Sequence, residues 1–366
     1  MTTVQLRSIE KTFGEQEVLR QLDFVAKSGS YVVLLGPSGC GKTTTLRMIA
    51  GLDSPDRGSI EFDGASVLRL EPRQRDVSMV FQQDGLYPHL TIEESIRFGM
   101  KRRLPATELQ TRVNEAVRLA GIERLLDRYP NSLSGGELRR GAIAKAIVRR
   151  SAIRLLDEPL SALDVSVRYA LQEDILQWHD SVPGTTIHVT HDGREAMRMA
   201  DVIAVMAHGR IVQSGSPRDV YHDPRTIAVA KAIGSSPMNL MPAVIEEGRL
   251  RFASSELECA SGLRFVAQDS PVLVGMRPES IQLDVSGTGR QEPSGISWSG
   301  TLEDVRPVES SLHLRVSVAQ KSLVIVLNAA SLRGLPSKGE AVSGFVPTEA
   351  LRVFAERDGW RLDLVQ

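Results

Sequence analysis

The strongest chemical signal in the sequence is a glycine-rich segment. Residues 36–43 read GPSGCGKT and fit the pattern G-x-x-x-x-G-K-[ST]. Glycines let the backbone curl so that its N–H groups point inward at a phosphate group, and the start of a following helix adds a favourable dipole. Lys42 would neutralise phosphate oxygens, and Thr43 would offer its hydroxyl to Mg²⁺. The segment therefore predicts a phosphate-binding loop.

Two adjacent carboxylates follow a second apolar run. In the segment IRLLDEP, Asp157 and Glu158 stand at the end of a strand-like stretch. An aspartate at this place can hold Mg²⁺ through its waters, and the next carboxylate can polarise an attacking water. Taken alone, the pair could equally be a solvated acidic turn. Together with the phosphate-binding loop, it predicts hydrolysis of a bound nucleotide.

Two further polar residues end apolar runs. Gln82 follows VSMVF, and His191 follows TIHVT. The amide could contact Mg²⁺ or the attacking water, and the imidazole could donate to a γ-phosphate. The alternatives are structural: a strand cap for Gln82 and an ordinary strand-end histidine for His191. These residues alone do not decide between the two interpretations.

The elements that would position these residues alternate along the first 235 residues. Apolar runs of strand length, such as YVVLLG before the phosphate-binding loop, are followed by amphipathic helical stretches. This alternation predicts an α/β fold with a mostly parallel sheet covered by helices. The strands stop between about residues 86 and 150, where helical spacing predicts an inserted helical subdomain.

Near residue 235 the pattern changes to a second domain. The segment GSSPMNLMP has the composition of a linker, and short alternating strands follow it. Such strands predict a β-rich domain, with a small barrel as the expected form. We therefore expect domains at residues 1–235 and 236–366.

Composition excludes several classes of protein. The 366 residues are 42% hydrophobic and 24% charged, with a formal net charge of −1, which gives no reason to expect a nucleic-acid partner. Two cysteines favour a reducing compartment over a disulfide framework. No run approaches the roughly 18 apolar residues of a membrane helix, so work at a membrane would need other subunits.

One more motif makes the set recognisable. Residues 133–137 read LSGGE, and residues 161–164 read SALD. With the motifs above, their order resembles the ABC ATPase family over the first 235 residues. The resemblance implies ATP and Mg²⁺ as cofactors. The residues that it implies for nucleotide binding are Phe13, stacked on adenine, and Gly36, Pro37, Ser38, Gly39, Cys40, Gly41, Lys42, Thr43 and Thr44.

The resemblance also implies roles for the remaining motif residues. Thr43, Gln82 and Asp157 would hold the metal, Glu158 would be the general base, and His191 would contact the γ-phosphate. In this family two copies enclose two ATP molecules head to tail. Ser134, Gly135 and Gly136 would then bind the ATP of the partner chain, because a serine cap and free N–H groups at a helix start suit a phosphate.

Residues 75–99 are similar to the corresponding stretch of maltose-type sugar importers. The segment GMRPESI (275–281) is similar to the OB-like transport-associated domain that such ATPases carry. The branch implies a peripheral homodimer on the cytoplasmic face of the inner membrane. Its expected partners are two integral-membrane permeases and, indirectly, an extracytoplasmic solute-binding protein, with a sugar or a glycerol-phosphate-like compound as the solute.

Other functions stay open at this point. The solute could be a polyamine, ferric ion or another anion, and the chain could be a soluble ABC ATPase without a permease. A P-loop kinase would lack LSGGE. The sequence departs from the family pattern at Asp84, Gly85, Glu137, Gly141, Arg154 and Gly193. None of these is Lys42, Asp157, Glu158 or His191, so we expect hydrolysis to be intact and the docking partner to be unusual.

Overall fold

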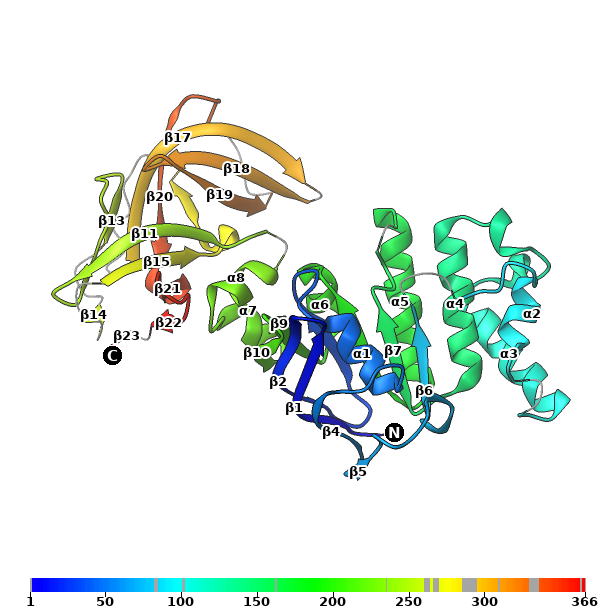
Figure 1. Ribbon diagram of the computed structural model, residues 1–366. Helices are drawn as coiled ribbons and strands as arrows, with labels where there is room; N and C mark the ends of the chain where they lie inside the picture. Colours follow the sequence, from blue (N-terminus) through cyan, green and yellow to red (C-terminus); the bar gives the residue numbers. More distant parts are fainter. Residues whose placement is uncertain are drawn as a thin grey trace. The chain divides into compact units, whose positions relative to one another are not determined.

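Two compact units make up the chain in the computed structural model (Figure 1), Met1–His222 and Asp223–Gln366. This division falls before the expected boundary at 235, because helix α8 (Ile227–Ala232) packs on the β-rich unit. Arg277 Nη1 donates to the carbonyls of Ala230 at 3.0 Å and Ile233 at 2.9 Å. The structure describes residues 2–81, 85–100, 103–161, 163–234, 236–259, 264–265, 270–284, 295–308, 310–328, 336–362 and 364–365.

The first unit is built on a six-stranded sheet in the order β10-β9-β3-β8-β7-β6. Strands β6, β7, β8, β3 and β9 pair in parallel, and β10 is antiparallel to β9. This is the sheet that the alternating apolar runs predict. Its strands are β3 (Tyr31–Leu35), β6 (Val77–Val80), β7 (Ile153–Asp157), β8 (Thr185–Thr190), β9 (Val202–Ala207) and β10 (Arg210–Gly215).

A smaller antiparallel sheet in the order β2-β1-β4-β5 completes the strands of this unit. Between residues 85 and 150, the described part of the chain contains helices and no strand. The sheet consists of β1 (Val4–Phe13), β2 (Gln16–Ala26), β4 (Arg57–Phe62) and β5 (Ala65–Ser66). The helices of the unit are α1 (Lys42–Ala50), α2 (Ile92–Arg97), α3 (Ala106–Ala120), α4 (Gly135–Arg149), α5 (Val165–Ser181), α6 (Gly193–Met199) and α7 (Pro217–His222).

The two faces of the six-stranded sheet have different chemistry, because neighbouring side chains in a strand point to opposite sides. One face is apolar and packs on α1 and the smaller sheet, with Val32, Leu34, Ile187 and Val189 in its core. The opposite face carries polar groups and is covered by α5 and α6. There the Arg154 guanidinium lies over the Trp178 ring of α5, 4.9 Å from its centroid.

Helix α1, which follows the phosphate-binding loop, is fixed at its C-terminal end by a buried arginine. Arg75 Nη1 donates to the carbonyls of Met48 at 2.7 Å and Ile49 at 2.9 Å, and burial lowers the pKa of its guanidinium. Gly51 ends the helix in the left-handed region with φ 80°, and a Cβ there would lie 2.8 Å from Arg75 Nε. Arg75 thus supplies a donor to the Ile49 carbonyl and a second donor to the Met48 carbonyl, which also accepts the Gly51 N–H.

The second unit is β-rich, as predicted, with two main antiparallel sheets around one apolar core. The first has the order β12-β11-β15-β21-β22, with β11 (Asn239–Glu246), β12 (Arg249–Arg251), β15 (Ser270–Met276), β21 (Leu351–Ala355) and β22 (Arg361–Leu362). The second has the order β16-β20-β17-β18-β19, with β16 (Gln282–Asp284), β17 (Gly295–Val308), β18 (Ser311–Val318), β19 (Lys321–Asn328) and β20 (Ala341–Pro347). The remaining strands are β13 (Leu257–Cys259), which pairs with β17, and the pair β14 (Arg264–Phe265) and β23 (Leu364–Val365).

In the described ranges of both units, no helix is long and apolar enough to cross a lipid bilayer.

Removing the Arg75 side chain tests the anchoring of α1. Arg75→Ala leaves the Ile49 carbonyl without a donor and the Met48 carbonyl with the Gly51 N–H alone, so we expect the free energy of unfolding of the first unit to fall by about 1–3 kcal/mol. Urea denaturation followed by circular dichroism measures this change. Arg69→Ala, at an exposed position of the same connection, is the matched control and should stay within about 0.5 kcal/mol of the parent. Equal stability of the two variants would contradict the anchoring role.

Candidate nucleotide-binding site

The phosphate-binding loop joins the end of β3 to the start of α1, as the sequence predicts. Two of its glycines are required by close contacts. A Cβ on Gly36 would lie 2.3 Å from the Met206 carbonyl oxygen, and one on Gly41, which has φ 103°, would lie 2.5 Å from Leu19 Cδ2. The loop is therefore pressed onto β9 and β2, and only glycine fits at both points. Its middle residues, 37–39, are exposed and free to receive a ligand.

The single cation of this loop is held inside it. Lys42 is only 4% exposed, and its Nζ donates to the carbonyls of Gly36 at 2.9 Å and Pro37 at 2.8 Å. The ammonium group is thus fixed beneath the exposed loop residues rather than extended into solvent. A phosphate that entered the loop would meet this charge together with the N–H groups at the start of α1.

A short hydrogen bond joins the loop helix to the end of β7. Thr43 Oγ1 donates to Asp157 Oδ1 at 2.9 Å. Burial raises the pKa of Asp157, and the nearby charge of Glu158 also raises it, while the Thr43 bond and the charges of Lys42 and Arg139 act in the opposite direction. A hydroxyl and a carboxylate oxygen side by side are ligands that Mg²⁺ prefers, so these residues fit the metal that the sequence predicts.

The next residue has a strained backbone that is held in place. Glu158 has φ 45°, in the left-handed region that non-glycine residues rarely adopt. Its N–H donates to the Val189 carbonyl at 3.0 Å, and Ser161 Oγ donates to its carbonyl at 2.9 Å. Such strain persists only where surrounding contacts determine the conformation, and it is commonly found at functional sites.

Glu158 and His191 meet at the same edge of the sheet. They follow β7 and β8, which are neighbouring parallel strands with Asp157 opposite Val189. His191 Nδ1 lies 3.4 Å from Glu158 Oε1, and the histidine side chain is 55% exposed. The structure therefore brings together Lys42, Thr43, Asp157, Glu158 and His191, which the sequence places in one site. The roles of these residues stay predictions.

Phe13 and Gln82 are two further residues that the sequence predicts for the nucleotide. Phe13 ends β1 and is 49% exposed, with Lys11 Nζ 5.1 Å from its ring centroid. An exposed ring of this kind is open to stacking on a planar base. Gln82 lies outside the described residues.

The signature segment is found elsewhere, at the start of α4. Ser134 caps this helix, and both its N–H and its hydroxyl donate to Glu137 Oε2 at 2.8 Å, which also lowers the pKa of Glu137. A Cβ on Gly136 would lie 2.8 Å from Val167 Cγ1, so the helix start packs closely on α5. Ser134 and Gly135 are exposed. The polar atoms of Ser134 are paired within α4 rather than with the phosphate-binding loop.

Two departures from the family pattern have structural reasons. Gly141 is buried in α4, and a Cβ there would lie 3.0 Å from Leu86 Cδ1, so the glycine lets the segment before α2 approach. Arg154 is buried in β7, where its Nη2 donates to the Val182 carbonyl and burial lowers its pKa to about 10. Gly184 makes room for it, since a Cβ would lie 2.8 Å from Nη2.

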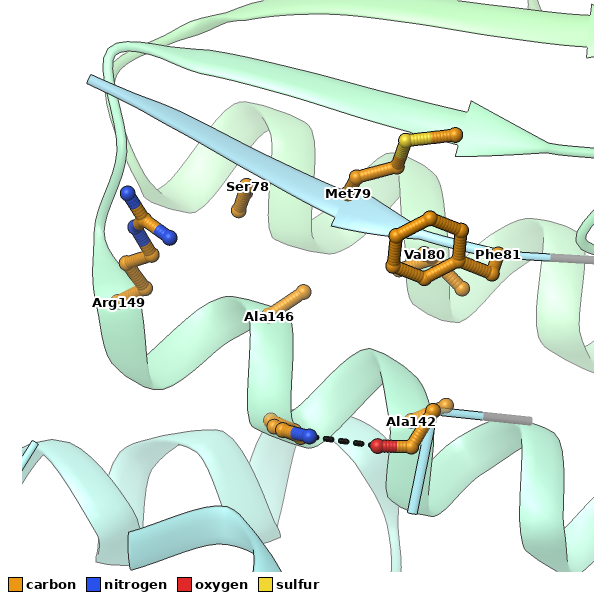
Figure 2. Close-up of a pocket in the computed structure, with 9 residues that line it drawn as sticks. Ser78, Met79, Val80, Phe81, Ala142, Ala146 and Arg149 are labelled. Atoms are coloured by element: carbon orange, nitrogen blue, oxygen red, sulfur yellow. Dashed lines mark hydrogen bonds between the residues drawn. The ribbon is translucent and has the colours of Figure 1, made fainter. Parts of the chain in front are cut away.

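A cavity of about 140 Å³ lies between the end of β6 and helix α4. Figure 2 shows residues 78–81 of the strand segment facing Ala142, Ala146 and Arg149 of the helix. Lys145 Nζ closes one side by donating to the Gly85 carbonyl at 2.5 Å, and it also lies 4.2 Å from the Tyr87 ring centroid. The cavity thus adjoins the segment LYPHLT (86–91). No sequence motif marks this gap between two elements.

Comparison with known proteins identifies the family of this chain. The family model described as ABC transporter matches residues 19–161, which contain the phosphate-binding loop, the signature segment and both carboxylates. The sn-glycerol-3-phosphate import ATP-binding protein of Rhizobium etli is 37% identical, and the alignment covers 99% of this chain and 100% of that one. The chain belongs to the ABC transporter ATPase family.

Two further relatives are import or transport ATP-binding proteins. The ABC ATPase is 42% identical to the trehalose/maltose import ATP-binding protein of Thermococcus litoralis, over 77% of this chain and 79% of that one. It is 40% identical to the sulfoquinovosyl glycerol transport ATP-binding protein of Agrobacterium fabrum, over 76% and 79%. These findings confirm the resemblance drawn from the sequence and the prediction of an ATPase coupled to solute import.

Solved structures confirm the fold of the first unit. A dimeric bacterial ABC transporter cassette is 29% identical, with a TM-score of 0.54, and the match covers 58% of this ATPase and 98% of that chain. A dimeric post-hydrolysis state bound to ADP and phosphate matches with a TM-score of 0.53 at the same identity and coverage. Nucleotide binding by the ABC ATPase is thus supported, while the metal stays a prediction.

Modification of Cys40 tests the tightness of the loop. Its Sγ would lie 2.9 Å from a Cβ on Gly36, and burial raises the pKa of the thiol, with the charge of Lys42 acting in the opposite direction. We expect N-ethylmaleimide to react slowly at pH 7 and faster as the pH rises, because the thiolate is the reactive form. Modification should abolish ATPase activity by blocking the loop, and ATP should protect.

The experiment uses a Cys259→Ser background, so that Cys40 is the only thiol, with mass spectrometry to count the adducts. A Cys40→Ala/Cys259→Ser chain treated in parallel should keep its activity. Full ATPase activity after one adduct per chain would show that Cys40 does not border the nucleotide.

Proposed function

We propose that the protein is the homodimeric ATPase of a binding-protein-dependent importer for a sugar or a glycerol-phosphate-like solute. The proposal of a dimer rests on one observation: the phosphate-binding loop and the start of α4 are separate in the chain's own fold. The loop, Asp157, Glu158 and His191 gather at one edge of the sheet, whereas Ser134 and Gly135 are exposed at the start of α4. An exposed helix start suited to phosphate is explained if a second copy supplies the ATP.

In the proposed mechanism, each side chain has a role that fits its position. Lys42 and the loop N–H groups bind the phosphates, and Phe13 stacks on the adenine. Thr43 and Asp157 would hold Mg²⁺, with Gln82 as a further contact, and the ion would neutralise charge that develops on the phosphate oxygens. Glu158 would orient and deprotonate the attacking water, and His191 would donate to the γ-phosphate.

Closure on ATP would then be passed to the membrane subunits through the helical subdomain. The cavity beside β6 and α4, with Lys145 and Tyr87 at its border, marks the surface on which we place the permeases. We propose a peripheral location on the cytoplasmic face of the inner membrane, with two permeases and an extracytoplasmic binding protein. The relatives support a sugar or glycerol-phosphate solute, because three of them are named for the transport of sn-glycerol-3-phosphate, trehalose/maltose or sulfoquinovosyl glycerol.

Substitution of the proposed general base tests the dimeric site. Glu158→Gln removes the base without changing its size, so we expect ATP hydrolysis to fall by about 100-fold or more. With Mg²⁺ and ATP this variant should form a stable dimer in gel filtration, and with ADP it should stay monomeric. Adding Ser134→Arg to the same chain should abolish the dimer, because it blocks the site of the partner.

The control is nucleotide binding by the monomeric double variant, which should remain because the loop is intact. Normal hydrolysis by Glu158→Gln would remove Glu158 from the base role. Dimers that persist with Ser134→Arg would contradict the shared site.

Membrane association tests the solute and the partners. An affinity-tagged chain expressed in its own host should purify from membranes with two polytopic proteins. In proteoliposomes of that complex, we expect the matching binding protein to stimulate ATPase activity with a sugar or glycerol phosphate and not with a polyamine or ferric ion. Purification with ribosomes or DNA instead would favour a soluble ABC ATPase.

A further inference from the structure

A chain of buried polar residues crosses the covered polar face of the central sheet. Tyr31 of β3 lies opposite Thr186 of β8, so Tyr31, Thr186, His188 and Thr190 share one face. Glu195 projects from α6 between the last two of these residues. His188 is fully buried, and Tyr31, Thr190 and Glu195 are at most 4% exposed. Three of them lie in the apolar runs YVVLLG and TIHVT, but the sequence predicts no chemical role for any of the four.

The first contacts of this series of buried residues join Tyr31 to His188 and His188 to Glu195. Tyr31 Oη lies 2.8 Å from His188 Nδ1. Burial raises the pKa of Tyr31 well above its ordinary value, and the charge of Glu195 raises it further, so the hydroxyl keeps its proton. When that hydroxyl donates to Nδ1, the imidazole proton lies on Nε2. Nε2 faces Glu195 Oε1 at 2.6 Å.

The same carboxylate connects to the strand end that carries His191. Thr190 Oγ1 donates to Glu195 Oε2 at 3.1 Å and accepts the Asp192 N–H at 3.0 Å. Glu195 thus receives contacts from both sides, as a buried carboxylate requires. Two of these contacts involve the residues immediately before and after His191, so the backbone on either side of this histidine is held by the buried chain.

Asp192 is fixed by a second set of contacts. Its Oδ1 accepts the Arg194 N–H at 2.8 Å and caps α6, and its Oδ2 lies 3.4 Å from Arg168 Nη1. Arg168 Nη2 also donates to the Leu163 carbonyl at 3.1 Å, in the SALD segment. The side chain of His191 itself is mostly exposed, so its position depends on the backbone between Thr190 and Asp192.

We propose that Glu195 is a positioning residue for ATP hydrolysis: through Thr190 and His188 it fixes the backbone from which His191 reaches the γ-phosphate. This inference rests on the role of His191 in the proposed function. A buried ionic group is weak evidence of stability, because apolar side chains of the same volume often stabilise a core as well. What this carboxylate adds is a fixed geometry beside the reacting phosphate, where small displacements lower the rate.

The matched substitutions are at Thr190 and Thr186, on the same strand and the same face. Thr190→Val has nearly the same shape but lacks the hydroxyl, so it cannot join Glu195 to Asp192. We expect kcat for ATP to fall about tenfold, with KM changed less than twofold, because only the approach to the transition state is affected. Thr190→Ser keeps the hydroxyl and should restore kcat. Thr186→Val, which removes a buried hydroxyl bonded to His179, should leave kcat within twofold of the parent.

Glu195→Gln provides the direct test, since it removes the negative charge beside His188 Nε2 and replaces one of the two carboxylate oxygens by an amide nitrogen. Nitrogen-15 NMR of the seven histidines, on the full chain without nucleotide, reports the geometry independently of activity. The His191 signal is assigned by its loss in His191→Gln. We expect Glu195→Gln and Thr190→Val to shift the His188 and His191 signals, and Thr190→Ser and Thr186→Val to leave the His191 signal in place.

Two results would overturn the proposal. One is an unchanged His191 signal in both Thr190→Val and Glu195→Gln. The other is a loss of kcat in Thr186→Val equal to that in Thr190→Val, since this would make the effect one of general stability. A different result would show that the proposed function itself is wrong. In that case His191→Ala would hydrolyse ATP at the parental rate, and this outcome does not depend on the histidine signals of the Glu195 variant.

Discussion

The parallel register of β3, β8 and β7 is the constraint on which the site depends. Leu35 lies opposite Thr190, and Asp157 lies opposite Val189. Because parallel strands end at the same edge, the loop after β3, the carboxylates at the end of β7 and the histidine after β8 must meet there. The Thr43–Asp157 hydrogen bond then closes the arrangement across more than a hundred residues of chain. A shift of one residue would send these side chains to the wrong face of the sheet.

Two charged side chains, Arg154 and Glu195, are buried under the helices that cover this sheet, and their surroundings differ. The Arg154 guanidinium donates to the Val182 carbonyl and lies over the Trp178 ring, and its burial lowers its pKa. Glu195 instead has two polar residues in contact with it, His188 and Thr190. Both charges lie on the covered polar face, whereas the face toward α1 is apolar. Two buried charges of this unit therefore lie in the layer under α5 and α6, and one of them, Glu195, is next to the strand end that carries His191.

The sequence predicts well those parts of the site that are encoded by local spacing. The loop 36–43 and the pair Asp157 and Glu158 are contiguous, so their residue types alone identify them, and the apolar runs place them at strand ends. The Arg75 cap and the His188–Glu195 contact could not be predicted, because each depends on which elements are neighbours in space. The one sequence signal for the latter was a histidine inside the apolar run TIHVT. The sequence marks Gly141 only as a departure from the family pattern, and the close approach of Leu86 to it appears only in the structure.

The cap of α4 has a consequence for how a shared site would work. Ser134 already donates its N–H and its hydroxyl to the Glu137 carboxylate. A phosphate of the partner's ATP would therefore have to replace that carboxylate as the acceptor of these two hydrogen bonds. An exchange of one charged acceptor for another contributes little net free energy. Closure of the dimer must then draw its free energy from elsewhere, from the Lys42 charge and the area buried between the chains. In the proposed dimer, the signature segment would then align the two copies more than it would hold them together.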